Sequence, residues 1–299
     1  SGALAFGTPS SEGVPAVVAQ DTLVARFNDL DSVRELFDRH PGGVAALIVT
    51  LAVRTGFRVA GLEQDAASAT VRGEGEALRA DLVVAADGLR STVRAALHPG
   101  YPGPRSSGYT SYRGIAEYEI DDGGDETWGR GRRFGFARLV DGRIYWYGTR
   151  NQPERRRDTL DGVRSAFAGW HDPIPALLAA TTTLLQHDLY DLALPLPPFA
   201  SGRVALLGDA AHAMTPNLGR GACAAIEDAA ALGRHVGSTL SVEAGLEAYD
   251  AERRPVTTKL VRTSRRIGQL GQIEGPALGG VRDGFLTAVG AVSSLGRRP

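Results

Sequence analysis

A strand, loop and helix segment in the last third of the 299-residue chain constrains its fold most. The apolar residues 203–207 predict a buried β-strand that leads directly into Gly208 and Asp209. The alanine-rich residues 221–235 predict a closely packed helix. This order of elements predicts a doubly wound α/β layer. The backbone N–H groups of residues 219–222 would lie at the helix N-terminus, where an anion is stabilised.

Composition limits the kind of partner and the compartment. The 33 Lys and Arg residues nearly balance the 34 Asp and Glu residues, so a small-molecule partner is expected rather than nucleic acid or a membrane. Cys223 is the only cysteine, which excludes an intramolecular disulfide and a cysteine-based zinc cluster, and it is expected to be a small buried residue. No metal site is predicted. Without an apolar stretch of about 18 residues, the chain is expected to be soluble and cytoplasmic.

Hydrophobic patterning and turn residues predict the other elements. The predicted helices are residues 44–54, residues 89–97, residues 155–180 with an interruption at Pro173, and residues 242–254, ended by Pro255 and followed by a basic helical tail. The predicted strands are residues 57–62, 69–72, 80–86, 188–194 and several antiparallel strands within 109–149.

Two motifs resemble one protein family. Residues 208–221, GDAAHAMTPNLGRG, resemble the GD signature of single-component FAD-dependent aromatic hydroxylases of the para-hydroxybenzoate-hydroxylase fold, and look most like their salicylate, urate and zeaxanthin-type branch. Residues 80–94, ADLVVAADGLRSTVR, resemble the DG motif of the same family. Taken alone, Asp87 and Gly88 would be a turn with an aspartate helix cap.

The resemblance implies an α/β fold class with an α+β insertion. In this interpretation, residues 1–104 and 199–260 form a partial doubly wound FAD-binding domain. Residues 105–198 form an antiparallel-sheet substrate domain, and residues 261–299 a C-terminal helical tail.

The resemblance also implies the site residues. Gly219 and Gly221 would lie at the flavin pyrimidine, Asp209 at the ribityl chain and Pro216 at the ring face. The full cofactor-binding set is Asp87, Gly88, Arg90, Gly208, Asp209, Pro216, Leu218, Gly219, Arg220 and Gly221, with Asp87 and Arg90 near the pyrophosphate. The substrate-binding set is Arg113, Tyr147 and Pro216, although alternating aromatic residues in a strand are commonly core residues. His212 is expected to pack rather than transfer protons, and no catalytic residue is assigned.

The implied function is an FAD- and NAD(P)H-dependent monooxygenase, with NADPH as the named reductant and NADH left open, that hydroxylates or epoxidises an aromatic or polycyclic small molecule through a flavin C4a-hydroperoxide. The sequence holds no strand followed by the G-x-G-x-x-G motif that receives the FAD pyrophosphate, and Arg39-His40 reverses the family's His-Arg. Three explanations remain open: a fragment, a second chain that supplies the dinucleotide-binding half, or a flavin-independent cyclase or isomerase. A non-catalytic binding protein for aromatic metabolites is a further alternative.

Overall fold

The computed structural model describes residues 34, 35, 38, 39, 55–73, 75–120, 123–239 and 241–284. The chain divides into two compact units, Ser1–Phe57 and Arg58–Pro299. In the first unit, the described residues 34, 35, 38 and 39 are helical and exposed, and Arg39 forms an ion pair with Glu35 at 3.3 Å. The helix predicted at residues 44–54 lies outside the described residues. Both sequence motifs, at residues 80–94 and 208–221, belong to the second unit.

The described residues of the second unit form three sheets. The strands of an antiparallel meander are β1 (Gly61–Gln64), β2 (Ala69–Gly73) and β3 (Glu76–Ala80). A mixed sheet has the order β10 (Ala200–Ser201), β11 (Val204–Leu206) and β4 (Val83–Ala85). A five-stranded antiparallel sheet has the order β6 (Gly124–Trp128), β7 (Arg132–Arg138), β8 (Ile144–Asn151), β5 (Pro104–Ala116) and β9 (Leu185–Leu192).

The parallel pair of β4 and β11 brings together two loops that are far apart in the sequence. Val83, Val84 and Ala85 pair with residues 204–206, and the Leu207 N–H donates to the Ala85 carbonyl at 2.9 Å. Both strands run in the same direction, so the loops that follow them leave the same edge of the sheet. We call the loop of the DG motif after β4 the DG loop, and the loop of residues 208–221 after β11 the GD loop. The doubly wound layer predicted at residues 203–207 therefore includes the strand of the DG motif.

The prediction that residues 80–86 form a single buried strand is wrong. β3 ends at Ala80, which pairs with Ala69 in the meander, and β4 begins three residues later. Val84 is also 42% exposed rather than buried. A continuous apolar run shows that a segment can be buried, but not which sheet each residue joins.

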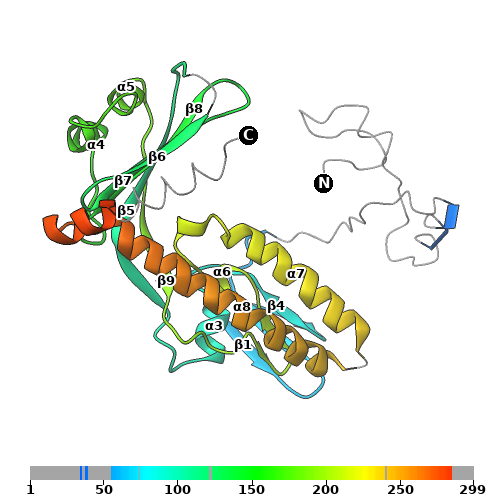
Figure 1. The fold of residues 1–299 in the computed structure, drawn as a ribbon. Helices are drawn as coiled ribbons and strands as arrows, with labels where there is room; N and C mark the ends of the chain where they lie inside the picture. The colour runs from blue at the N-terminus through cyan, green and yellow to red at the C-terminus, as the bar shows by residue number, and fades with distance from the viewer. Residues whose placement is uncertain are drawn as a thin grey trace, which may run out of the picture. The chain divides into compact units, whose positions relative to one another are not determined.

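The antiparallel sheet has two different faces. One face packs against the short helices α4 (Leu160–Phe167) and α5 (Ile174–Ala179) (Figure 1). Trp146 stacks on Phe134 there with ring centroids 5.3 Å apart, and its indole N–H donates to Thr181 Oγ1 at 2.7 Å. Gly114 leaves space for this ring, because a Cβ atom there would approach it to 2.7 Å. The predicted helix at 155–180 is thus two helices with residues 168–173 between them.

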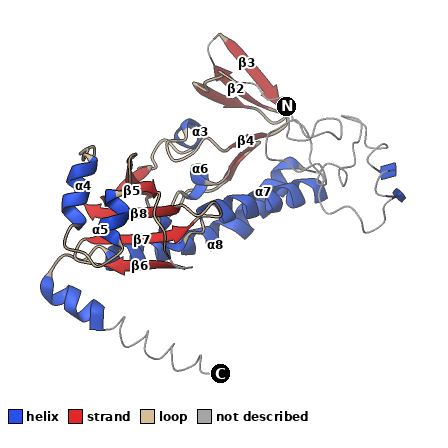
Figure 2. Cartoon of the chain, turned by 90° about the horizontal axis from the view of Figure 1, so that it is seen from above, coloured by secondary structure: helices blue, strands red, loops and turns tan. Residues whose placement is uncertain are grey.

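The opposite face of the sheet is near the long helix α8 (Val242–Gly271) (Figures 1 and 2). Cβ atoms at Gly268 and Gly271 of α8 would lie within 2.8 Å of the Tyr109 hydroxyl and of Arg133 Cδ, respectively. These two glycines are one helical turn apart and let side chains of the sheet and of the GD loop approach the helix backbone. A site between the sheet and this loop depends on that space.

The prediction that Pro255 ends the helix is wrong, because α8 continues from Val242 to Gly271 with Pro255 inside it. Pro255 removes one backbone donor but is exposed, and the Thr257 hydroxyl donates to the Arg253 carbonyl at 2.9 Å. Buried residues on both sides of the proline, including Tyr249 and Val261, hold the two halves against one core. Tertiary packing therefore outweighs the local cost of the proline.

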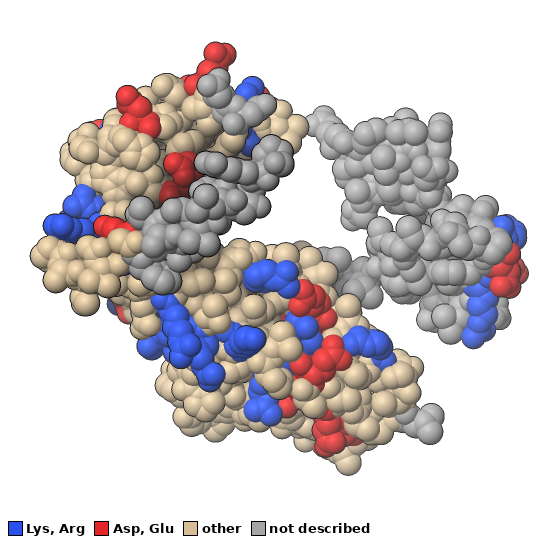
Figure 3. All heavy atoms as spheres, viewed as in Figure 1, with Lys and Arg blue, Asp and Glu red and all other residues tan. Residues whose placement is uncertain are grey.

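Basic side chains gather along α8 (Figure 3). Lys259, Arg262 and Arg266 are exposed and recur at helical spacing, as in the predicted basic tail. The pattern is that of a solvated helix face. Among the helices of the described residues, none combines the length and the apolar character that a membrane span needs.

The core between the sheet and its two short helices gives a first test of the fold. Phe167 is fully buried, with its ring centroid 5.4 Å from that of Phe134 and 5.0 Å from that of Trp170. We expect Phe167→Ala to lower the free energy of unfolding by about 3–5 kcal/mol in urea titrations, because it removes transfer energy and leaves a cavity. The control Val140→Ala changes a fully exposed side chain, so we expect an effect within about 0.5 kcal/mol. Equal effects for both variants would contradict this packing.

Candidate functional site

The candidate site begins at the carboxyl ends of β4 and β11, the place where open α/β sheets bind ligands. After β4, the Asp87 carboxylate accepts from the Val93 N–H at 3.2 Å. The Ser91 hydroxyl accepts from the Arg94 N–H at 2.8 Å and caps α3 (Thr92–Leu97). Asp87 is exposed and is therefore accessible to a ligand, while one of its oxygens orders the loop.

Arg94 ties the two loops together. Its side chain is buried, Nη1 donates to the Ala210 carbonyl at 2.8 Å, and Nη2 donates to the Leu89 carbonyl at 2.6 Å. Sequence reasoning missed this role, although Arg94 closes the DG stretch. The predicted residue Arg90 is instead exposed, with its guanidinium carbon 5.3 Å from the centroid of the Tyr190 ring.

After β11, Gly208 takes a conformation that only glycine adopts easily. Its φ of 60° and ψ of −134° place it outside the regions open to other residues. A Cβ atom there would also approach Ala225 Cβ to 3.1 Å. The turn buries Ala210 and His212 and leaves Asp209 exposed at the start of the short helix α6 (Asp209–His212), where its carboxylate can accept hydrogen bonds from a ligand.

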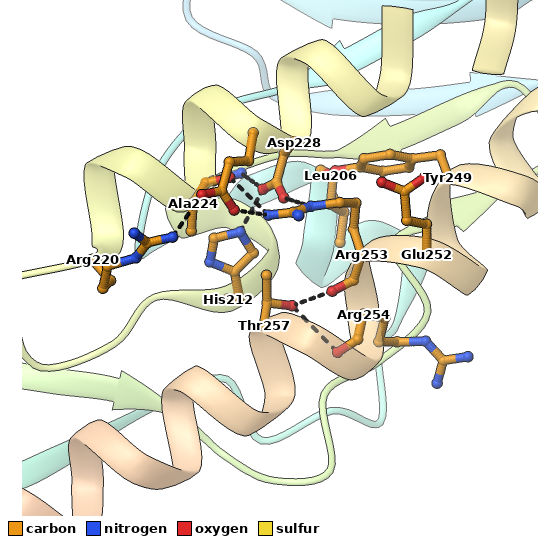
Figure 4. Close-up of polar contacts among 12 residues, drawn as sticks. Leu206, His212, Arg220, Ala224, Asp228, Tyr249, Glu252, Arg253, Arg254 and Thr257 are labelled. Carbon is orange, nitrogen blue, oxygen red and sulfur yellow. Dashed lines mark hydrogen bonds and ion pairs between the residues drawn. The ribbon is translucent and has the colours of Figure 1, made fainter. Parts of the chain in front are cut away.

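A buried network holds this loop against α7 (Gly221–Ser238) and α8 (Figure 4). Asp228 Oδ2 contacts His212 Nε2 at 2.5 Å and accepts from the Gly208 N–H at 3.2 Å. Asp228 Oδ1 accepts from Arg253 Nε at 2.8 Å, and Arg253 Nη2 donates to Glu227 Oε2 at 3.0 Å. The loop, α7 and α8 are therefore joined at one fully buried carboxylate.

The charge state of Asp228 follows from these contacts. Burial alone would raise the pKa of the Asp228 carboxyl. The hydrogen bonds from His212, Arg253 and the Gly208 N–H outweigh burial and hold that pKa below its ordinary value. His212 thus has a structural partner and is fully buried, which agrees with a packing role.

The end of the GD loop, at Gly219, leaves the N-terminus of α7 open. The short 3-10 helix η2 (Pro216–Leu218) ends at Gly219, which has a left-handed φ of 61°. The α7 N-cap, Arg220, makes no side-chain capping bond, and its guanidinium turns to Glu227 Oε1 at 2.6 Å. Hypothetical Cβ atoms at Gly219 and Gly221 would meet nothing within 4 Å. First-turn N–H groups, which lack partners within a helix, can therefore face a ligand here.

Asn217 joins this loop to the antiparallel sheet. Its Nδ2 atom donates to the Tyr109 hydroxyl at 3.0 Å, to Thr215 Oγ1 at 2.8 Å and to the Ser264 carbonyl at 2.9 Å. Its Oδ1 atom accepts from Arg133 Nη2 at 2.6 Å. Arg133 was missed from the sequence, although alternation along β7 could have placed it on the same face as the predicted residue Tyr147.

Two of the three predicted substrate residues, Arg113 and Tyr147, lie on this face. Arg113 and Tyr147 pair across β5 and β8. Gly135 lets the Tyr147 ring lie across the neighbouring strand, since a Cβ atom there would approach the ring to 2.5 Å. Burial and the nearby Glu126 carboxylate raise the pKa of the Tyr147 hydroxyl, which therefore remains a proton donor at neutral pH. Pro216 is exposed in η2.

The structure groups the predicted cofactor residues into the two loops. The GD loop and α7 N-terminus carry Gly208, Asp209, Pro216, Leu218, Gly219, Arg220 and Gly221, and the DG loop carries Asp87, Gly88 and Arg90. The prediction of a buried Cys223 is wrong, because its side chain lies on an exposed face of α7. A helix rich in alanine has small residues on every face, so composition did not identify the buried one. Groups of His, Cys, Asp and Glu that could hold a metal do not occur in the described ranges.

Comparison with known proteins places the site in a family. A family model described as "FAD binding domain" matches residues 45–119 and 181–264, which include both loops. Aurachin C monooxygenase/isomerase of Stigmatella aurantiaca is 42% identical over 209 residues, 67% of this chain and 54% of that protein. The 2-heptyl-3-hydroxy-4(1H)-quinolone synthase of Pseudomonas aeruginosa is 37% identical over 206 residues, 65% of this chain and 53% of that protein. The chain spans about half the length of these two curated relatives.

A solved structure shares the fold. The crystal structure of Klebsiella pneumoniae HpxO complexed with FAD and uric acid aligns with a TM-score of 0.71 and 30% identity. The alignment covers 84% of this chain and 65% of that one.

The network at Asp228 generates a prediction with a defined pH dependence. We expect Asp228→Asn to lower the free energy of unfolding by about 3–5 kcal/mol at neutral pH, because Arg253 then keeps a buried charge without its main partner. The native pKa of Asp228 is lowered, so its stabilisation is present above the unfolded pKa of about 3.9 and is lost as the pH falls through the native pKa. Urea unfolding at several pH values should show this acid loss in the parent and a smaller loss in the variant.

A matched control removes an exposed carboxylate. Glu63→Gln breaks the surface pair between Glu63 and Arg72, in which both side chains are more than half exposed. It should leave the unfolding curve at neutral pH almost unchanged. If Asp228→Asn behaves like this control, the buried network does not hold the loop.

Proposed function

The chain belongs to the FAD-dependent aromatic hydroxylase family, and we propose that it acts in a monooxygenase that uses FAD and NADPH to oxygenate an aromatic or polycyclic small molecule. The observation that carries the proposal is the contact of Asn217, in the GD loop, with Tyr109 and Arg133 of the sheet. The Asn217 contacts join the loop before the open N-terminus of α7 to a sheet face that carries aromatic residues. A cofactor bound at the start of α7 and a substrate bound on the sheet face would therefore be neighbours.

The described residues fit the ring and ribityl part of a flavin. Reduced flavin carries negative charge on its pyrimidine, which suits the open N–H groups at the start of α7. The open space above Gly219 and Gly221 would admit a flat ring, and the exposed Asp209 carboxylate would accept from ribityl hydroxyls. Pro216 would lie at the ring face, next to Leu218. The exposed Asp87 and Arg90, with Gly88 between the strand and the helix cap, would lie near the pyrophosphate.

When bound, the flavin would accept a hydride from NADPH and activate oxygen. The chain's own residues would bind and orient the substrate. Arg113 and Tyr147 share one face of the sheet, and the protonated Tyr147 hydroxyl can donate a hydrogen bond to a substrate oxygen or nitrogen. Arg220 would act through its backbone, because its side chain turns to Glu227.

The substrate class is proposed from the relatives and from the aromatic residues of this face. One relative's name contains a 4(1H)-quinolone, a bicyclic aromatic ring that carries an oxygen and a nitrogen. The side chains of Trp128, Tyr109 and Tyr147 offer flat apolar surface with polar edges on the same face. We therefore propose a bicyclic heteroaromatic substrate.

A flavin-independent isomerase or cyclase is the second candidate. The relative with 42% identity is named a monooxygenase and isomerase, so a fold of this kind is associated with both reaction types. In this alternative, the same sheet face would position a substrate for rearrangement without redox chemistry.

The adenosine half of FAD needs a further structural unit. The mixed sheet has β4 at one edge, and within the described ranges no strand pairs with the outer side of β4. Val84 on that strand is 42% exposed, and Ile226 on α7 is 71% exposed. We propose that a strand, glycine-rich loop and helix unit adds in parallel to β4 and receives the FAD pyrophosphate. A second polypeptide is one source of this unit.

Flavin binding is the test of the proposed function. When FAD is added to the purified protein, we expect the visible absorption spectrum of the flavin to change and the flavin fluorescence to decrease. Asp209→Ala should weaken binding about 10- to 100-fold, because a hydrogen bond from a charged group contributes about 1.5–3 kcal/mol. Asp161→Ala is the control, since this carboxylate is 86% exposed on α4. Spectra are read with and without a purified dinucleotide-binding unit from a relative.

The outcomes separate the two candidates. NADPH oxidation that depends on FAD and on an aromatic substrate would support the monooxygenase. Intact substrate turnover with no spectral change on adding FAD would rule it out and support the isomerase or cyclase. Equal flavin affinity in Asp209→Ala and the parent would remove Asp209 from the site.

A further inference from the structure

A small polar cavity lies where the start of β5, the end of β9, α8 and the GD loop meet. Its volume is about 110 Å³. Because one water molecule takes up about 30 Å³, the cavity has room for about three or four waters, or for one tetrahedral oxyanion. The side chains that matter for its chemistry are Arg105, Ser107, Asp191, Thr215, Arg265 and Gln269.

A β-bulge directs the Ser107 side chain into this cavity. Ser107, Gly108 and Tyr109 of β5 lie opposite Leu189 alone on β9, so the regular pairing of the two strands is interrupted here. Gly108 permits the bulge, because its φ of 78° is in the left-handed region. The Ser107 hydroxyl oxygen is buried and has no hydrogen-bond partner among the described residues. A buried hydroxyl in this condition favours a ligand or ordered water.

Two arginines share one carboxylate in the lining. Asp191 is 1% exposed, and its Oδ2 atom accepts from Arg265 Nε at 2.6 Å. Its Oδ1 atom lies 3.3 Å from Arg105 Nε. Arg265 Nη2 donates to the Leu192 carbonyl at 2.6 Å. Both carboxylate oxygens are therefore occupied, and the two arginines leave one positive charge in excess of Asp191.

The lining also has more free donors than free acceptors. Arg105 reaches Asp191 only through long contacts, at 3.3 Å from Nε and 3.5 Å from Nη2, and its side chain is 47% exposed. Within the part of the chain that the structure describes, Arg265 Nη1 and the Gln269 side-chain amide make no hydrogen bond. A ligand with several acceptor oxygens and a negative charge matches these donors.

We propose that this cavity binds a phosphate group, either free inorganic phosphate or the phosphate ester of a nucleotide. The phosphate oxygens accept hydrogen bonds from Arg105, Arg265 and the Ser107 hydroxyl, and the anion offsets the excess positive charge. Thr215 of the GD loop lines the same cavity, so a bound phosphate connects the sheet, α8 and this loop. The donors differ from the residues assigned above to the flavin and the substrate.

Phosphate binding is measured by isothermal titration calorimetry on the purified protein, without flavin and with the ionic strength held constant by sodium chloride. We expect saturable binding of one phosphate. Hydrogen exchange should slow in peptides that cover residues 104–109 and 264–271. Phosphate also stabilises folded proteins without binding to a site. The thermal readout is therefore a difference: at ten times the Kd, the rise in Tm should be at least about 2 °C larger in the parent than in Arg105→Met.

Variants test the individual donors. Arg105→Met leaves Asp191 paired with Arg265 and should lower phosphate affinity about 10- to 100-fold, because it removes a hydrogen bond between charged groups. Ser107→Ala should lower it about 3- to 10-fold. The matched control is Arg143→Met, since Arg143 also pairs with an aspartate and is 48% exposed, against 47% for Arg105. The control should bind phosphate as the parent does.

Two nucleotides distinguish the sources of the phosphate group. NADP+ carries a phosphate ester that NAD+ lacks. If NADP+ binds at least about 10-fold more tightly than NAD+, and Arg105→Met removes this preference, the site takes the ester phosphate of a nucleotide. If inorganic phosphate binds and the two nucleotides do not differ, the site takes the free anion.

Two results would overturn the proposal. One is the absence of saturable phosphate binding by the parent, which is measured without any variant and so does not depend on the folding of one. The other is equal phosphate affinity in the parent, Arg105→Met and Ser107→Ala. Either result would leave a hydrated cluster of ion pairs at this place. Because no flavin or substrate is present, neither result bears on the proposed monooxygenase function.

Discussion

The contact on which the site depends is the buried Asp228 carboxylate and its partners. Asp228 accepts from the backbone of Gly208, pairs with His212 in the GD loop, and pairs with Arg253 on α8. A buried carboxylate is unfavourable without such partners, so loop, helix and helix must meet in one arrangement for the network to form. This network also holds the turn at Gly208, whose backbone conformation any other residue would adopt only with strain. The open start of α7 and the exposed Asp209 follow from that turn.

A second set of contacts relates this loop to the antiparallel sheet. The amide nitrogen of Asn217 donates hydrogen bonds to the Tyr109 hydroxyl and the Ser264 carbonyl, and its amide oxygen accepts one from Arg133. Gly268 and Gly271 on α8 leave space for these side chains. The GD loop and the sheet face are thus connected by one side chain, so the proposed cofactor side and the proposed substrate side adjoin each other.

Local patterns predicted the elements that local sequence determines. The strand at residues 203–207, the helix that starts at Gly221 and the glycine turns follow from neighbouring residues, and the family and its fold class are confirmed. The errors come from long-range packing. Pro255 lies inside α8 because both halves of the helix share a core, and Val84 and Cys223 are exposed because burial depends on what packs against each face.

The site residues divide in the same way. Motif resemblance placed Asp87, Gly208, Asp209 and Gly219 in two loops, and the parallel pairing of β4 and β11 brings these loops to one edge of the sheet. Arg94 and Arg133 were missed because each contacts a residue that is distant in the sequence, Ala210 at 116 positions and Asn217 at 84 positions. A buried arginine is evident only when its environment is known. The division of residues 1–104, 105–198, 199–260 and 261–299 among domains stays a prediction.

Hydrogen exchange with a flavin that lacks the adenosine half tests the central claim most directly. FMN carries the ring and ribityl chain but needs no dinucleotide-binding unit, so it isolates the part of the site that this chain contains. Added FMN should slow amide exchange in peptides that cover residues 207–222, with no comparable change in α4 and α5. Unchanged exchange across residues 207–222 at FMN concentrations far above those of the protein would contradict a flavin cradle in this loop.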